Sequence, residues 1–175
     1  MGQCESMGSR FLLKIILLVI LLAGVAAPSA ARPSQGSSSG EYSVGRIIIK
    51  TTERKLLFVN GEKDIIVYTI AVGRQGREWT GSTSISRKVL NPAWAPPSKI
   101  RKDNPRLPAL VKAGPNNPLG VAVLVLGDGT YGIHGTNRPE TIGTFASYGC
   151  FRMYNKDILD LFSRVAIGTS VTVVP

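Results

Sequence analysis

Short apolar runs rich in β-branched residues recur downstream of residue 42, and they predict strands. Three consecutive isoleucines lie within Arg46–Thr51, and the runs Lys55–Val59 and Ile65–Val72 follow. Asn60-Gly61 comes directly after the second run. An Asn-Gly pair between two such runs is typical of a hairpin, because both central positions of a type I′ turn need a positive φ. The pattern therefore predicts an antiparallel hairpin closed by Asn60-Gly61.

Three further strands are predicted in the second half of the chain. Val121–Leu126 is apolar throughout, and Gly127-Asp128-Gly129 supplies turn residues after it. Tyr131–His134 then continues as a strand that ends on His134, and Ser170–Val174 is a closing strand. Together these runs predict a mainly β domain, an antiparallel β-sandwich with one or two short helices.

One helix is predicted from Asn155 onward. Asn155 is a favourable N-cap residue, and Asp157 lies in the first turn, where its charge complements the helix dipole. The residues that share an apolar face at helical spacing are Ile158, Leu159, Phe162 and Val165. We expect this face to pack beneath the segment that carries Cys150.

Residues 1–31 have the pattern of a secretory signal peptide. Arg10 and Lys14 precede an uncharged apolar run over Ile15–Ala27, and small residues follow up to Ala31. A basic start, an apolar run of this length and a small-residue exit predict export with cleavage after Ala31. The alternative is an uncleaved membrane anchor over Phe11–Ala27, although the uncharged run is shorter than the roughly 18 apolar residues that a spanning helix requires.

Composition divides the rest of the chain into a linker and one domain. Residues 32–41 are rich in Ser, Gly and Pro without apolar periodicity, which is typical of a flexible tether. Residues 42–175 are long enough for one domain with a hydrophobic core. Within them, Asn91–Pro118 holds seven of the eleven prolines together with Trp94. We predict an ordered loop that forms one wall of an active-site cleft; the alternative is a structural connection with Trp94 buried for packing.

The chain of 175 residues is strongly basic. It has 21 Lys and Arg against 11 Asp and Glu, a formal net charge of +10, and loss of the predicted signal peptide would leave about +9. Such a charge favours a polyanionic partner. No nucleic-acid reader motif is present, so an acidic wall polymer or an anionic membrane surface fits better. A merely solvated basic surface is the alternative.

His134 and Cys150 are the candidate chemistry. His134 is the only histidine, and Cys150 is the only cysteine after the apolar run, since Cys4 precedes that run. An exported protein with a lone thiol is unusual, because structural cysteines in oxidising compartments come in pairs. A thiol needs a base beside it to become nucleophilic at neutral pH. The two residues therefore form a candidate catalytic pair; the alternative for Cys150 is a small buried apolar side chain.

The segment IHGTNRPETIGTFASYGCFRM, residues 133–153, resembles the signature of the L,D-transpeptidase catalytic domain, the YkuD family. In that family a His-Gly pair is followed by Ser/Thr-His-Gly-Cys and often by Arg-Met. The resemblance extends outward to Asn117-Pro118-Leu119-Gly120, to Asn91-Pro92-Ala93-Trp94 with Pro96-Pro97, and to Gly73 with Thr80-Gly81. It covers the chain from about Val44 to Pro175 and implies the L,D-transpeptidase type of β-sandwich.

The resemblance implies a role for each residue of the signature. Cys150 resembles the nucleophile that holds the acyl group as a thioester, and His134 resembles the base that takes its proton. The backbone carbonyl of Gly135 would orient the imidazole. The backbone N–H groups of Gly149, Cys150 and Tyr148 would form the oxyanion hole.

Three further residues are expected to contact the substrate: Arg152, Ser147 and Trp94. Arg152 is suited to a substrate carboxylate, since a guanidinium binds carboxylates bidentately. Its alternative role is a structural hydrogen-bond hub for the Cys150 loop.

The sequence departs from the family pattern at two places. Tyr148 stands where many members have histidine before Gly-Cys, so no second imidazole can act there. Thr80-Gly81 stands where members often have Thr-Pro, which concerns only the conformation of that loop.

The resemblance implies an exported acyltransferase of the periplasm or cell envelope that acts on peptidoglycan stem peptides. It would cleave an L,D bond in a tetrapeptide stem, release D-alanine and transfer the acyl group to an amine. The acceptor could be a neighbouring stem, a wall-anchored lipoprotein or a D-amino acid. We expect a monomer without metal or cofactor. The alternatives are an L,D-carboxypeptidase that uses water as acceptor, and a non-catalytic wall-binding module.

Overall fold

The structure is a computed structural model that describes residues 45–175. The predicted signal peptide, the linker over residues 32–41 and the first three residues of the predicted domain lie outside the described residues. Among the described residues, no helix is both long enough and apolar enough to cross a membrane.

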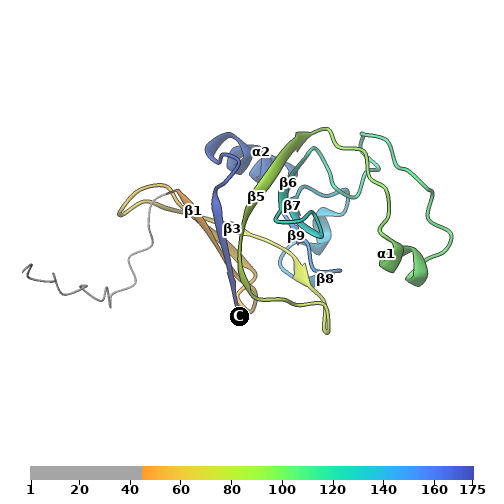
Figure 1. Ribbon diagram of the computed structural model, residues 1–175, viewed down its shortest axis with the longest axis horizontal. Helices are drawn as coiled ribbons and strands as arrows, with labels where there is room; N and C mark the ends of the chain where they lie inside the picture. The colour runs from red at the N-terminus through yellow and green to blue at the C-terminus, as the bar shows by residue number, and fades with distance from the viewer. Residues whose placement is uncertain (1–44) are drawn as a thin grey trace, which may run out of the picture. The chain divides into compact units, whose positions relative to one another are not determined.

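Strands make up most of the regular structure of residues 45–175 (Figure 1). The strands are β1 (Arg46–Lys50), β2 (Lys55–Val59), β3 (Ile65–Thr69), β4 (Val72–Gly73), β5 (Gly81–Leu90), β6 (Ala122–Leu126), β7 (Tyr131–His134), β8 (Phe145–Ser147), β9 (Phe151–Arg152) and β10 (Ser170–Val174). The helical segments are α1 (Ser98–Asp103), the 3₁₀ turn η1 (Pro139–Thr141) and α2 (Asn155–Arg164). The predicted mainly β class with short helices is confirmed.

Eight strands form one curled sheet in the order β3-β2-β1-β10-β5-β6-β7-β9, and β4 pairs with β8 separately. The sheet is mixed, where the sequence predicted a mainly antiparallel sandwich: β1 and β10 are parallel, and so are β7 and β9. These parallel partners come from distant parts of the chain, such as Ile47 opposite Val171. Parallel strands are not joined by a tight turn. Turn motifs in the sequence therefore predict hairpins but not parallel pairs.

The predicted hairpin forms, but its turn differs from the prediction. β2 and β3 pair antiparallel, with Val59 opposite Ile65. The chain connects them through residues 60–64, and neither Asn60 nor Gly61 has a positive φ, so the type I′ turn was wrong. Instead the Asn60 N–H donates to the Asp64 carbonyl (2.9 Å) and the Asn60 side chain donates to the Asp64 carboxylate (2.5 Å). These bonds close a wider loop.

The sequence did not reveal the short strands β8 and β9 or the ten-residue strand β5. β5 shows why. Its sequence, GSTSISRKVL, is mostly polar and contains no continuous apolar run. It pairs antiparallel with β10 on one side and with β6 on the other. Pairing with both neighbours, rather than its own apolar pattern, therefore makes this segment a strand.

The proline-rich segment 91–118 is a long loop, as predicted, and it contains α1. The backbones of Trp94 and Val111 pair across it through two reciprocal N–H···O bonds of 2.8 Å. The buried Asn117 side chain donates to the carbonyls of Pro92 (2.7 Å) and Lys112 (3.1 Å), and it accepts the Leu119 N–H (2.8 Å). In Figure 1 this loop extends from the sheet between β5 and β6.

α2 packs on the sheet through a face that differs in part from the predicted one. The apolar residues that join the core are Ile158, Leu161, Phe162 and Val165. Leu159 is 44% exposed, because it follows Ile158 by one residue and is turned about 100° around the helix. Among the strands, α2 packs mainly on β6 and β7, which lead to His134. Phe151 and Met153, which follow Cys150 in the chain, belong to the same hydrophobic core as Ile158 and Leu161.

The two leucines of α2 provide a matched test of this packing. Leu161→Ala should lower the free energy of unfolding by about 2–5 kcal/mol, because it leaves a cavity in the core. Leu159→Ala removes the same atoms from an exposed position and should change it by less than about 1 kcal/mol. Urea denaturation of both variants measures the difference, and equal losses would contradict the observed helix face.

Candidate active site

His134 and Cys150 are delivered by neighbouring parallel strands. β7 pairs with β9 so that Ile133 lies opposite Phe151, and Cys150 directly precedes β9. Alternate residues of a strand point to opposite faces of the sheet. Ile133 and Phe151 enter the hydrophobic core, so His134 and Cys150 share the opposite face. The chain between them folds back as the sequence predicted.

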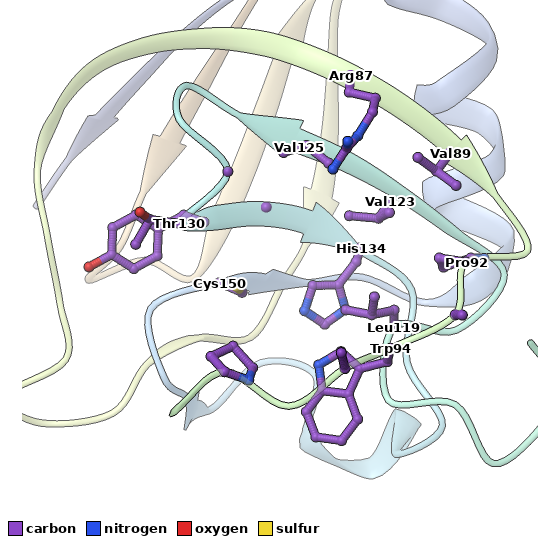
Figure 2. Close-up of a pocket in the computed structure, with 16 residues that line it drawn as sticks. Arg87, Val89, Pro92, Trp94, Leu119, Val123, Val125, Thr130, His134 and Cys150 are labelled. Atoms are coloured by element: carbon purple, nitrogen blue, oxygen red, sulfur yellow. The ribbon is translucent and has the colours of Figure 1, made fainter. Parts of the chain in front are cut away.

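This shared face forms the floor of a pocket of about 410 Å³ (Figure 2). The floor residues from β5, β6 and β7 are Arg87, Val89, Val123, Val125, Gly132 and His134. The wall residues from the proline-rich loop are Pro92, Ala93, Trp94, Ala95 and Pro97. The predicted wall is therefore confirmed. A pocket of this volume, apolar with few polar groups, is typical of a small-molecule or peptide site.

The His134 imidazole is buried and has a defined tautomer. Its Nδ1 lies 2.6 Å from the Gly135 carbonyl oxygen, and the side chain is 5% exposed. A carbonyl only accepts hydrogen bonds, so Nδ1 carries the proton and Nε2 holds the free lone pair. Burial lowers the pKa of His134 from 6.5 to about 4, although the Gly135 carbonyl acts in the opposite direction. The imidazole is therefore neutral at pH 7.

Cys150 lines the same pocket and is partly exposed. Burial raises the pKa of its thiol above the ordinary 9.0, while a hydrogen bond with the Gly132 backbone and the charge of Arg152 act in the opposite direction. At neutral pH one pocket is therefore lined by a neutral thiol and a neutral imidazole. These are the groups that a nucleophile and a general base require, since Nε2 has a free lone pair for the thiol proton.

The chain that follows His134 is fixed by Asn155. Asn155 Nδ2 donates to the Thr136 carbonyl (3.1 Å), and the Thr136 N–H donates to Asn155 Oδ1 (3.0 Å). The predicted N-cap role of Asn155 was wrong, since Tyr154 holds the N-cap position without a side-chain bond. A Cβ on Gly135 would lie 2.2 Å from Asn155 Oδ1. The start of α2 thus holds in place the carbonyl that orients the imidazole.

The turn that presents Cys150 is held by several hydrogen bonds. Ser147 Oγ donates to the Cys150 carbonyl (2.5 Å) and accepts the Gly149 N–H (3.0 Å). Trp79 Nε1 donates to the Gly149 carbonyl (2.9 Å), and the Trp79 ring stacks on Tyr131 with centroids 4.9 Å apart. Gly149 has a φ of +116°, and a Cβ there would lie 2.5 Å from the Tyr131 ring. Only glycine fits this position.

These bonds differ from the predicted roles of Ser147 and Gly149. Ser147 is 1% exposed and its hydroxyl already donates and accepts, so it offers no free hydroxyl to a substrate. The Gly149 N–H is donated to Ser147 and is therefore not free to bind an oxyanion. The sequence reasoning also missed Trp79, although this residue directly precedes Thr80-Gly81 in the family resemblance.

Comparison with known proteins identifies the family. The family model for the L,D-transpeptidase catalytic domain, YkuD, matches residues 44–173. The chain belongs to this family. It is 40% identical over 134 residues to the "Probable L,D-transpeptidase YbiS" of Escherichia coli (strain K12), covering 71% of this chain and 43% of YbiS. It is 35% identical over 143 residues to the "Putative L,D-transpeptidase YkuD" of Bacillus licheniformis, covering 80% and 81%.

Solved structures share the fold. An L,D-transpeptidase from Mycobacterium smegmatis superposes with a TM-score of 0.58 at 14% identity, covering 74% of this chain and 58% of that chain. The catalytic domain of the Enterococcus faecium L,D-transpeptidase gives a TM-score of 0.56 at 18% identity, covering 77% and 100%. This chain spans less than half the length of YbiS.

Tyr148, which replaces the histidine of many L,D-transpeptidases, has partners outside the pocket. The guanidinium groups of Arg74 and Arg77 lie 4.0 and 5.5 Å from its ring centroid. Both arginines also face Asp103 of α1, at 3.1 and 3.6 Å. The ring therefore links the turn before Cys150 to the proline-rich loop, and the oxyanion role of its N–H stays a prediction.

Gly81 replaces the proline found in many members of the family. Its φ is +133°, in the region that favours glycine, and nothing lies within 4 Å of a Cβ built there. Proline is fixed near φ −65° and could not adopt this backbone. The passage into β5 therefore has a conformation that the family's Thr-Pro sequence would not give.

Arg152 lies near the pair but does not line the pocket. Its Nη1 is 3.5 Å from Thr141 Oγ1, and its backbone exchanges two 2.9 Å hydrogen bonds with Ala71. Its charge favours the Cys150 thiolate and disfavours a protonated His134. These contacts favour its structural alternative, and binding of a substrate carboxylate stays a prediction.

Within the described residues, no three His, Cys, Asp or Glu side chains gather closely enough to hold a metal ion. Zinc sites need three or four such ligands, and the pocket itself offers one imidazole and one thiol. The expected independence of metals and cofactors stays a prediction.

Acid should destabilise the fold through His134. Its pKa is about 4 in the folded protein and near 6.5 when unfolded, so the unfolded state binds more protons between these values. The stability contributed by the neutral imidazole is complete above pH 6.5. It should decline by up to about 3 kcal/mol as the pH falls to 4.

Denaturant unfolding of wild type and His134→Gln across pH 4–7 measures this contribution, because carboxylates titrate alike in both proteins. The difference in free energy of unfolding between the two should shrink toward pH 4. Parallel pH dependence of the two proteins would refute the buried neutral imidazole.

Proposed function

We propose that this chain is an exported cysteine acyltransferase that acts on peptidoglycan stem peptides. The observation that carries the proposal is the position of Cys150 and the free Nε2 side of His134 on one face of the sheet, in one pocket. Membership of the L,D-transpeptidase family supports the donor bond, an L,D bond in a tetrapeptide stem. Cys150 is the proposed nucleophile and His134 the proposed base.

In the first step the Cys150 sulfur attacks the donor carbonyl while its proton passes to His134 Nε2. The ordinary thiol pKa is 9.0 and burial raises it, whereas the imidazole pKa is about 4. Moving the proton alone therefore costs on the order of 7 kcal/mol before the attraction between the two new charges is counted. One turnover per second corresponds to a barrier of about 17 kcal/mol, so the ion pair can form transiently along the reaction. Arg152 contributes, because its charge favours the thiolate.

The tetrahedral intermediate then collapses. The carbon–nitrogen bond breaks, His134 returns the proton to the departing amine, and D-alanine leaves a thioester on Cys150. We propose the backbone N–H groups of Cys150 and Tyr148 as oxyanion donors, since the Gly149 N–H is engaged by Ser147. One such donor lowers the activation barrier by roughly 3 to 4 kcal/mol.

In the second step an amine attacks the thioester. His134 takes the amine proton, the carbon–sulfur bond breaks, and the proton passes to the departing thiolate. The proposed acceptor is the side-chain amine of another stem's diamino acid; a lipoprotein or a D-amino acid would react by the same chemistry. If water reaches the thioester first, the outcome is an L,D-carboxypeptidase.

We also propose that the protein works in the cell envelope. Arg10, Lys14 and the apolar run over Ile15–Ala27 support export through the secretory route. A net charge of +10 favours association with an acidic wall polymer.

Tetrapeptide muropeptides provide the test. Wild-type protein should yield crosslinked dimers and free D-alanine, and its intact mass should show an acyl adduct on Cys150. Cys150→Ala and His134→Gln should each lower turnover by about 1,000-fold or more, because nucleophile and base act as one unit. Circular dichroism of the variants at pH 7 should match that of wild type.

Each other outcome contradicts one part of the proposal. Tripeptides without dimers would show hydrolysis in place of transfer. Muropeptide binding without any turnover would indicate a wall-binding module. Unchanged turnover in either variant would overturn the assignment of that residue.

A further inference from the structure

Arg87 is the one permanently charged side chain of the pocket. The other fifteen lining residues are His134, Cys150 and thirteen apolar, small or uncharged polar residues. Within residues 45–175 the structure gives the Arg87 guanidinium no hydrogen bond, ion pair or ring contact. In Figure 2 the side chain lies over the pocket beside Val125. An unpaired guanidinium beside apolar side chains is suited to bind an anion.

A β-bulge in β5 places the Arg87 side chain on the pocket face of the sheet. Ile85 pairs with Leu126, but the next pair is Arg87 with Val125, so two steps along β5 match one step along β6. Ile85 and Leu126 are buried in the core. If Ser86 were paired as a regular strand residue, strict alternation would send Arg87 to the same core face as Ile85. Bulges that redirect one side chain occur next to active sites.

Lys88, the adjacent basic residue, points away from the pocket and has partners of its own. Lys88 pairs with Leu124 and points to the core side of the sheet. Its Nζ donates to the carbonyls of Phe162 (2.7 Å) and Val165 (2.5 Å) at the end of α2. Lys88 thus satisfies a helix terminus, and only Arg87 is left free.

The sheet register places Arg87 in line with the nucleophile. Arg87 pairs with Val125, and Val125 pairs with Gly132. Because Ile133 pairs with Phe151, the preceding residues Gly132 and Cys150 are also level with each other. Three strand spacings separate the two backbones, which is about 14 Å. In Figure 2 the Arg87 side chain leans along the sheet toward Val125. An extended arginine in this direction covers up to about 6 Å of the separation, which brings the guanidinium to roughly 8 Å from the reacting centre at its closest.

We propose that Arg87 selects the donor stem by binding the side-chain carboxylate of its diamino acid. This inference rests on the proposed function and names the substrate class of that site. In an extended diamino acid with a terminal carboxylate, six bonds separate the reacting carbonyl carbon from the distal carboxylate carbon, about 8 Å. The carboxylate therefore reaches the guanidinium while the carbonyl lies at Cys150. A stem with an amide or no carboxylate at this position leaves Arg87 unpaired.

Three tetrapeptide donors test the inference: one with the free side-chain carboxylate, one amidated there, and one amidated at its glutamate instead. Release of D-alanine gives kcat/KM for each. Wild type should prefer the free carboxylate over its amide by about 10- to 100-fold. Arg87→Met should lose this preference, because kcat/KM should fall only for the donor with the free side-chain carboxylate. Arg87→Lys, which keeps the charge but not the bidentate geometry, should keep part of it.

Arg106→Met is the matched control. Arg106 is exposed and does not line the pocket, so its removal tests the loss of one positive charge as such. It should leave the preference of wild type unchanged. Arg87→Met slowing all three donors equally, or none, would overturn the inference. If amidation of the glutamate, rather than of the diamino acid, removed the preference, the assignment of Arg87 to the diamino-acid carboxylate would be wrong.

Failure of the inference is distinct from failure of the proposed function. If Arg87 has no such role, wild type still releases D-alanine from every donor. If wild type releases D-alanine from none, the proposed function falls and the inference falls with it.

Discussion

The hydrogen bond between His134 Nδ1 and the Gly135 carbonyl is the contact on which the site depends. At 2.6 Å it fixes the tautomer, so that Nε2 keeps the lone pair that a general base requires. Unlike a carboxylate, a backbone carbonyl does not titrate, so it accepts this hydrogen bond at every pH. It also carries no negative charge that would stabilise an imidazolium. Burial outweighs the opposing effect of this hydrogen bond and leaves the imidazole neutral, with a pKa of about 4. Asn155 holds the backbone beyond that carbonyl through two hydrogen bonds to Thr136.

The mixed sheet brings the second half of the pair to the first. Parallel pairing of β7 with β9 sets Cys150 on the face that carries His134, although 16 positions separate them. The same register extends through β6 to β5 and makes one pocket floor from β5, β6 and β7, with Cys150 just before β9. Cys150, His134 and Arg87 therefore have fixed relative positions, because each lies on or next to a strand whose opposite face is packed into the core.

Local sequence signals predicted the elements that depend on local physics, and long-range pairing decided the rest. The strand ending at His134, the closing strand and the β2–β3 hairpin follow from apolar runs and turn residues. β5 is polar and becomes a strand only between β6 and β10. Leu159 was placed on the wrong face by one helical position. The candidate catalytic pair came from the lone histidine and the lone thiol, and family resemblance supplied its reaction. Arg87 was missed because its bulge exists only in the paired sheet.

The single histidine of the sequence allows the central claim to be measured directly. ¹⁵N NMR of histidine-labelled protein without an affinity tag reports one imidazole, its tautomer and its titration. The structure predicts a neutral ring protonated at Nδ1 at pH 7, with a midpoint near pH 4. An imidazolium at pH 7, or a neutral ring protonated at Nε2, would contradict the account of a neutral thiol–imidazole pair oriented by Gly135.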